Sequence, residues 1–318
     1  MQLNHRAFAI ARGLLSQAEA IGCSAVEAAG VRILDCGVRS PGSERAGIGM
    51  AQASLAGLAE VDVLPPDSAS GVDGGPSVRV ASREPVAACL AAQYAGWRIA
   101  ADGFFAMASG PVRAAIGREV LYDTIGLRER PDVAVGILEA SDLPPERVCL
   151  ELAEAAGVRP DRLILLVART ASPAGTLQVV ARSLETALHK LHDIGFDLGR
   201  IRGGTGRAPL PPVARHDLAA IGCTNDAILY GGTVRLDVVG DDASLDAAGP
   251  RGVSGSSPAF GRSFLELFEA AGRDFYRIDP ALFAPARLEF RNLDTGERHA
   301  FGTLRPDLVA ASFAACLR

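Results

Sequence analysis

The middle of the chain alternates short apolar segments typical of strands with longer segments typical of helices, and this order restricts the fold most strongly. The pattern predicts strands at residues 133–138 and 162–167, and helices at residues 145–156 and 174–192. Nearly continuous apolar strands between helices are typical of parallel or mixed sheets that helices cover on both faces. We therefore expect an α/β fold of mixed α+β character.

The length of the chain indicates more than one compact body. Its 318 residues exceed the size of an ordinary domain, which is about 100–200 residues. We expect one catalytic unit of two α/β lobes with helix-covered mixed sheets, at about residues 1–127 and 128–318, with the C-terminal segment able to interleave with the first lobe.

Charge and lysine content exclude several classes of function. The formal net charge is -5 and the arginines are scattered among acidic residues, so we expect no basic face that would bind nucleic acid. Lys190 is the single lysine. A P-loop needs a Gly-Lys pair and is therefore excluded, and Schiff-base chemistry would depend on this one residue.

The six cysteines lie far apart in the sequence, without the Cys-x-x-Cys spacing of zinc or iron–sulfur sites. We therefore expect no metal centre and thiols that stay reduced. The first residues lack the continuous apolar core of a secretory signal, and no run of about 18 apolar residues follows. The expected location is the cytoplasm, with no membrane partner.

The predicted helix at residues 174–192 has a polar row beside its apolar stripe. At about 100° per residue, the stripe contains Leu177, Val180, Ala181, Leu184, Leu188 and Leu191. The row contains Gln178, Arg182, Glu185 and His189, and the outer face contains Ser183, Thr186 and Lys190. A polar row that lies beside the apolar stripe, rather than opposite it, would lie at the edge of a cleft. Arg182 and Glu185 are neighbours on a helix surface, although the pattern alone favours a solvated ion pair of little energetic weight.

Gly203, Gly204 and Gly206 are compatible with a dinucleotide-binding loop or with a plain turn. The dinucleotide motif needs a third glycine where Pro209 stands, and a helix where proline-rich chain follows. The sequence therefore favours the turn.

Two segments, residues 104–111 and 224–232, combine aromatic, small and polar residues. The residues alone favour helix caps at Ser109 and Thr224, with the aromatic side chains in the core. The alternative is a flat slot in which backbone N–H groups and a ring receive a planar heterocycle.

Nearly the whole chain resembles methenyltetrahydromethanopterin cyclohydrolase. The matching segments include Asp35-Cys36-Gly37-Val38 and Thr170-Ala171-Ser172, with further matches at residues 92–97, 105–111, 178–185, 224–233 and 274–287. No single motif among them is specific to this family, but so many matches in the same order are specific to it.

The resemblance implies a pterin substrate in a cleft between two lobes, and a reaction without a redox cofactor or a catalytic metal. The family's catalytic glutamate matches Glu185 and its arginine matches Arg182. Glu185 would deliver water to the methenyl carbon and accept its proton, while Arg182 would orient Glu185 and favour its ionised form. Substrate contacts are expected from Gln178, Thr170, Ser172, Ser109, Gly110, Asn225, Asp226 and Tyr230.

Three functions stay open at this stage. The first is reversible hydrolysis of 5,10-methenyltetrahydromethanopterin to its 5-formyl derivative in one-carbon metabolism, which serves formaldehyde oxidation in bacteria and also methanogenesis. The others are a related cyclohydrolase acting on methenyl-tetrahydrofolate and a catalytically silent pterin-binding subunit. The presence of Glu185 favours an enzyme. We also expect a homo-oligomer, either a dimer or a trimer.

Overall fold

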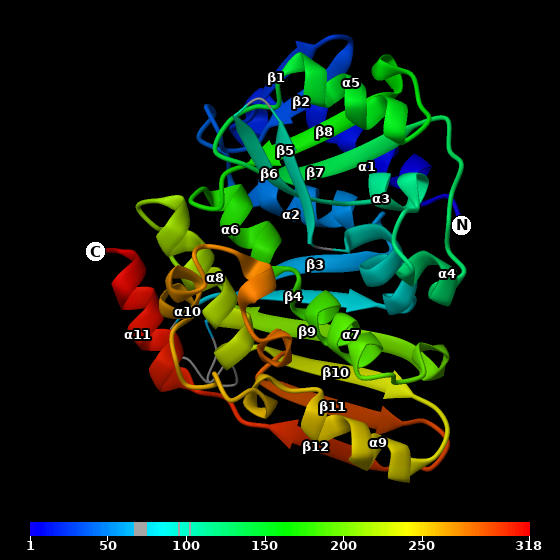
Figure 1. The fold of residues 1–318 in the computed structure, drawn as a ribbon, viewed down its shortest axis with the longest axis vertical. Coiled ribbons are helices and arrows are strands. Elements are labelled where there is room, and N and C mark those ends of the chain that lie inside the picture. Colours follow the sequence, from blue (N-terminus) through cyan, green and yellow to red (C-terminus); the bar gives the residue numbers. More distant parts are fainter. Residues whose placement is uncertain (67–74, 95, 102) are drawn as a thin grey trace. The chain divides into compact units, whose positions relative to one another are not determined.

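The computed structural model describes residues 1–66, 75–94, 96–101 and 103–318. The chain divides into two compact units, each built from two segments (Figure 1). Unit 1 contains Met1–Ala59 and Val86–Gln178, and unit 2 contains Glu60–Pro85 and Val179–Arg318. The boundary expected near residue 127 falls inside unit 1.

In the described part of unit 1, a six-stranded mixed sheet has the order β1-β2-β8-β7-β6-β5. β2, β8 and β7 are parallel neighbours, and the remaining pairs are antiparallel. The strands are β1 (Ser24–Ala28), β2 (Val31–Asp35), β5 (Trp97–Ala101), β6 (Phe104–Ser109), β7 (Ala134–Glu139) and β8 (Leu163–Ala168). β7 and β8 confirm the strands predicted at residues 133–138 and 162–167.

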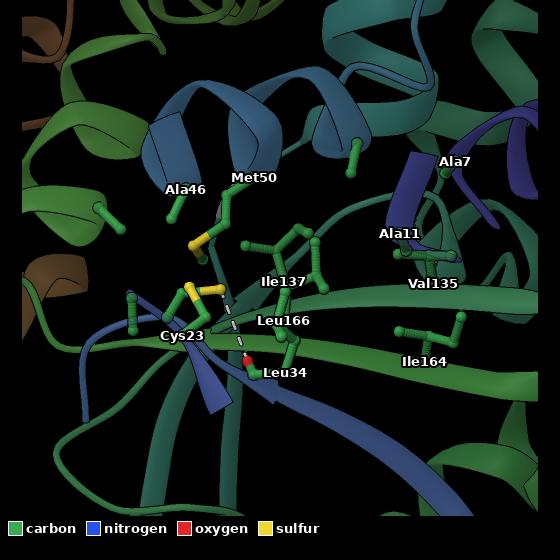
Figure 2. Close-up of a cluster of buried hydrophobic side chains, with 14 of the residues drawn as sticks. Ala7, Ala11, Cys23, Leu34, Ala46, Met50, Val135, Ile137, Ile164 and Leu166 are labelled. Atoms are coloured by element: carbon green, nitrogen blue, oxygen red, sulfur yellow. Dashed lines mark hydrogen bonds between the residues drawn. The ribbon is translucent and has the colours of Figure 1, made fainter. Parts of the chain in front are cut away.

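Helices cover both faces of this sheet, which explains why β8 is apolar throughout. Ile164 and Leu166 pack in a cluster with α1 and α2, whereas Leu163 and Leu165 pack in a cluster with α5. Figure 2 shows the first cluster, in which Met50 points from α2 toward the sheet. The helices are α1 (Leu3–Ser16), α2 (Glu44–Ser54), α3 (Val112–Ile116), α4 (Leu121–Ile125), α5 (Glu146–Ala155), α6 (Pro173–Val180), the π-helix η3 (Val86–Gln93), and the 3₁₀-helices η1 (Glu19–Ile21) and η4 (Pro160–Arg162).

Unit 2 contains a second six-stranded mixed sheet within the described residues, in the order β12-β11-β10-β9-β4-β3. β10 and β11 are parallel, and β9 is antiparallel to both of its neighbours. The strands are β3 (Ala59–Leu64), β4 (Ser77–Ser82), β9 (Ile201–Pro209), β10 (Thr233–Val238), β11 (Arg287–Asn292) and β12 (Arg298–Gly302).

Most α-helices described in unit 2 pack in one of two places. α7 packs on β9, β10 and β4, and α8, α10 and α11 share an apolar cluster that contains Tyr230 and Phe264. The helices are α7 (Ser183–Asp193), α8 (Asp217–Gly231), α9 (Asp242–Ala248), α10 (Phe264–Ala270), α11 (Pro306–Cys316), and the 3₁₀-helices η5 (Leu198–Arg200), η6 (Gly249–Arg251), η7 (Ser254–Ser256), η8 (Phe275–Arg277) and η9 (Pro280–Leu282).

The α/β class with two mixed sheets is therefore confirmed. The substrate cleft expected between two lobes stays a prediction. Within the described ranges, no helix is long and apolar enough to cross a membrane.

Candidate active site

A break between two helices carries the predicted catalytic pair. The single helix predicted at residues 174–192 is wrong, because α6 and α7 are separate helices. Arg182 lies between them with φ -93° and ψ 5°, outside the helical range of ψ. Its N–H donates to the carbonyl of Val179 at 3.0 Å, and its carbonyl accepts from the N–H of Thr186 at 2.8 Å. Arg182 is therefore the N-cap residue of α7, and Glu185 lies in the first turn of that helix.

Arg182 and Glu185 form an ion pair that is withdrawn from solvent. Nε of Arg182 donates to Oε2 of Glu185 at 3.3 Å, and the two side chains are 10% and 4% exposed. The contact predicted from the spacing is confirmed, but the solvated pair that the pattern alone favoured is wrong. Burying two charges costs desolvation free energy that their attraction need not repay, so such a pair is more informative about function than about stability.

The surroundings of α7 differ from the predicted amphipathic pattern. Ser183 and Lys190, expected on the solvent-facing side, are 0% and 7% exposed, and burial lowers the pKa of Lys190. α7 is therefore enclosed over more of its circumference than its apolar stripe indicates.

The glycine-rich segment beside α7 is not a turn. Gly203, Gly204 and Gly206 lie in β9, between β4 and β10. The turn predicted from their composition is therefore wrong, because the ladders on both sides hold the segment extended. The small size of Gly204 and Gly206, which face Ser183 and Leu184, lets α7 pack close to this strand.

The carboxyl ends of the parallel strands in unit 1 gather a second group of polar residues. Thr170 follows β8, and its Oγ1 donates to a carboxylate oxygen of Glu139 at the end of β7. Oγ of Ser172 donates to the carbonyl of Arg169 at 2.7 Å and accepts from the N–H of Gly175 at 3.0 Å, so it shapes the start of α6. Ligands of open α/β sheets bind at this edge.

Two acidic residues at the same edge, Glu139 and Asp35, are missing from the residues predicted from the sequence. The carboxylate of Asp35, which ends β2, accepts hydrogen bonds from the four consecutive N–H groups of residues 37–40, at 2.7 to 3.0 Å. An acidic residue directly at the end of an apolar strand is the signal that could have identified both.

Gln178 lies on α6 and is 4% exposed. Its Oε1 atom has no hydrogen-bond partner among the described residues. A buried acceptor without a partner costs about 1–3 kcal/mol, so this atom is suited to accept from an N–H group of a ligand.

Ser109 and Gly110 stand where β6 ends beside β7. Ser109 is buried and pairs with Ile137. Gly110 has a φ of +94°, and a Cβ atom there would lie 3.0 Å from Cγ1 of Ile137 and 3.3 Å from its nitrogen. The glycine is therefore explained by backbone conformation and packing.

The three predicted residues of α8 are bonded within unit 2. Asp226 accepts from the N–H of Phe264 at 2.8 Å and from Oγ of Ser312 at 2.7 Å, and burial raises its pKa to about 6. The hydroxyl of Tyr230 donates to the carbonyl of Arg262 and accepts from the N–H of Gly261 at 3.1 Å. These are the contacts of residues that pack helices together.

Asn225, the third of these residues, donates to the carbonyl of Ile221 at 2.8 Å. The structure thus brings Arg182 to Glu185 in unit 2, and places Thr170 and Ser172 in one turn of unit 1. The substrate contacts predicted for the α8 residues stay predictions.

In the part of the chain that the structure describes, no three His, Cys, Asp or Glu side chains form a group that could hold a metal ion.

The chain is similar to known proteins along almost its whole length. Residues 2–313 match the protein family described as Cyclohydrolase (MCH). A methenyltetrahydromethanopterin cyclohydrolase of Methylobacterium organophilum is 43% identical over 307 residues, covering 95% of this chain and 94% of the relative. Proteins of the same name from Rhodopirellula baltica and Methanosarcina barkeri are 43% and 38% identical, covering 90% and 89% of this chain and 86% and 89% of the relatives. This chain therefore belongs to the Cyclohydrolase (MCH) family.

Proposed function

We propose that this chain catalyses the reversible hydrolysis of 5,10-methenyltetrahydromethanopterin to 5-formyltetrahydromethanopterin. The observation that carries the proposal is the buried pair of Arg182 and Glu185 at the start of α7, in a chain whose relatives bear the name of this enzyme. The one-carbon unit stays at the oxidation level of formate, so the proposed reaction needs no redox cofactor. A catalytic metal is not part of it either.

The substrate is a resonance-stabilised cation whose one-carbon unit bridges N5 and N10. Glu185 hydrogen-bonds a water molecule and accepts a proton from it as the water oxygen forms a bond to that carbon. The hydroxyl group of the adduct then loses its proton as the C=O bond forms, the bond between the carbon and N10 breaks, N10 takes the proton held by Glu185, and the formyl group stays on N5. Hydrolysis of the cation to the neutral formyl product releases one proton overall.

Arg182 acts on Glu185 rather than on the reacting carbon. A guanidinium fixes the direction of a carboxylate through charge-assisted hydrogen bonds, and Nε of Arg182 is placed to do so. Glu185 also lies in the first turn of α7, where the helix dipole favours an anion. Withdrawal from solvent strengthens the attraction between this carboxylate and a cationic substrate.

Gln178 is the substrate contact that the structure supports best, because its buried Oε1 is an acceptor and a pterin ring carries N–H donors. Thr170, Ser172, Ser109 and Gly110 complete the proposed contacts in unit 1. We propose a cytoplasmic location, since all six cysteines, which lie in the described part of the chain, are thiols. A homo-oligomer stays a prediction.

Parallel assays with methenyl-tetrahydromethanopterin and methenyl-tetrahydrofolate, followed by loss of the methenyl absorbance, test the proposal. Rapid loss with the first substrate, well above the rate without enzyme, is the expected result. Turnover of the folate alone would show a related cyclohydrolase. Binding without turnover of either substrate would show a catalytically silent subunit.

A further inference from the structure

Gly206 occupies a position where its own strand does not require glycine. It lies inside β9, where it pairs with Val80 of β4 and Val234 of β10. It is not among the glycines with positive φ, so its backbone conformation does not require glycine. Glycine in the interior of a strand weakens the strand and marks a close approach of another backbone. The requirement for glycine must therefore come from a neighbouring element.

That neighbour is the first turn of α7. A Cβ atom at Gly206 would lie 2.5 Å from Oγ of Ser183, 2.6 Å from the nitrogen of Leu184 and 3.0 Å from its Cα. Two of these atoms belong to the backbone, so a rotamer change cannot move them away. Ser183 is fully buried, which leaves it little room to shift.

We propose that Gly206 is a positioning residue for hydrolysis, acting through Glu185. Ser183 and Leu184 are the first two residues of α7, and Glu185 is the third. The missing side chain at Gly206 lets this turn lie directly on β9, and so sets where the turn, and the carboxylate of Glu185 with it, stands on the sheet of unit 2. The inference rests on the proposed catalytic role of Glu185.

The other glycines of β9 provide matched controls. A Cβ at Gly204 would meet Cδ1 of Leu184 and Cδ2 of Leu236, each at 2.9 Å, which are ends of flexible side chains. A Cβ at Gly203 would meet nothing closer than 3.4 Å, an ordinary van der Waals distance. The three positions share a strand and differ in what an added methyl group would displace.

The test compares Gly206→Ala with Gly203→Ala in steady-state kinetics and thermal unfolding. Gly206→Ala is expected to lower kcat on the order of tenfold to a hundredfold, the usual effect of a small misplacement of a catalytic group, with little change in KM. Gly203→Ala is expected to stay near the parent, with Gly204→Ala between them. A folded Gly206→Ala enzyme with normal kcat would overturn the proposal.

A double-mutant cycle with Glu185→Gln separates positioning from a structural defect. If Gly206 acts through Glu185, adding Gly206→Ala to Glu185→Gln should lower kcat little further. An undiminished further loss would show that the glycine only supports the fold. Near-normal activity of Glu185→Gln by itself would instead contradict the proposed function, independently of Gly206.

Should Gly206→Ala fail to fold, Ser183→Thr examines the same contact from the helix. It keeps the hydroxyl and adds one methyl group to the residue that faces Gly206. The same loss of kcat, abolished in the Glu185→Gln background, is expected, and a folded Ser183→Thr enzyme with normal kcat would count against the proposal.

Discussion

Nε of Arg182 lies 3.3 Å from Oε2 of Glu185 across the start of α7, because Arg182 is the N-cap residue of that helix. Local hydrogen bonds hold the pair in this arrangement. Thr186 donates both its N–H, at 2.8 Å, and its Oγ1, at 2.9 Å, to the carbonyl of Arg182. The geometry of the pair is therefore set within unit 2 by the break between the two helices.

Replacement of Arg182 by alanine should lower both stability and turnover. Removing one member of a buried ion pair leaves the other charge uncompensated, which typically costs 3–5 kcal/mol, to order of magnitude, in the free energy of unfolding. We expect kcat to fall more than KM rises, since the guanidinium orients Glu185. Arg182→Lys should recover only part of the activity, because an ammonium lacks the planar fork.

The exposed pair of Arg147 and Glu151 provides the control for this experiment, since such surface pairs contribute about 0–1 kcal/mol. Arg147→Ala should leave kinetics unchanged. A large rise in KM for Arg182→Ala with unchanged kcat would show that Arg182 binds the pterin directly.

Gln178→Met should raise the stability of the protein and weaken its binding of the substrate. The substitution removes the buried Oε1 that lacks a partner while keeping similar length, so the free energy of unfolding should rise by about 1–3 kcal/mol. KM should rise because a substrate N–H loses its acceptor. Urea unfolding and steady-state kinetics measure the two effects, with the exposed Gln17→Met as control. An unchanged KM would remove Gln178 from the substrate contacts.

Asp226→Asn should change how stability depends on pH. Burial raises the pKa of Asp226 from its ordinary 3.8 to about 6, so the folded protein binds the proton more tightly than the unfolded chain. The parent therefore loses stability as pH rises through this range, by on the order of 2–3 kcal/mol. The asparagine variant lacks this loss.

Urea unfolding at pH 4.5 and 7.5 checks the expectation for Asp226. The stability of Asp226→Asn relative to the parent should increase between the two pH values, whereas the exposed Asp142→Asn should follow the parent. A difference that does not change with pH would refute the account of Asp226. A raised KM in the same variant would reveal the substrate contact predicted from the sequence.

Exhaustive dialysis against a chelator should leave activity intact. In the proposed mechanism a carboxylate, Glu185, positions the water and takes its proton, so no metal ion is needed at that step. Assays before dialysis, after dialysis and after addition of zinc or iron measure the effect. Activity that is lost and returns only with added metal would contradict the mechanism.

Local sequence patterns predicted the elements whose structure follows from their own apolar spacing. β7, α5 and β8 follow from apolar runs and helical spacing, and the contact of Arg182 with Glu185 follows from a separation of three residues. The break between α6 and α7 does not, because Leu177, Val180, Leu184 and Leu188 keep one apolar period through it and all are buried.

The glycine-rich segment is a second element that its local sequence pattern predicted wrongly. Three glycines in four residues predict a turn by composition, yet strand pairing on both sides makes the segment part of β9. What requires Gly206 is the distant turn of α7, and no local pattern contains that contact. The acceptor role of Asp35 toward four N–H groups likewise depends on how the chain turns after β2.

The kinetics of Glu185→Gln test the central claim most directly. Glutamine keeps the size and hydrogen-bonding shape of the side chain but cannot accept the proton of the attacking water. With methenyl-tetrahydromethanopterin as substrate, kcat should fall by about two to four orders of magnitude, whereas the fold and substrate binding should be retained. The melting temperature should be lower than that of the parent, because the buried guanidinium of Arg182 loses its countercharge. Glu146→Gln, an exposed glutamate in the first turn of α5, should behave like the parent. A folded Glu185→Gln enzyme with near-normal kcat would show that Glu185 is not the proton acceptor.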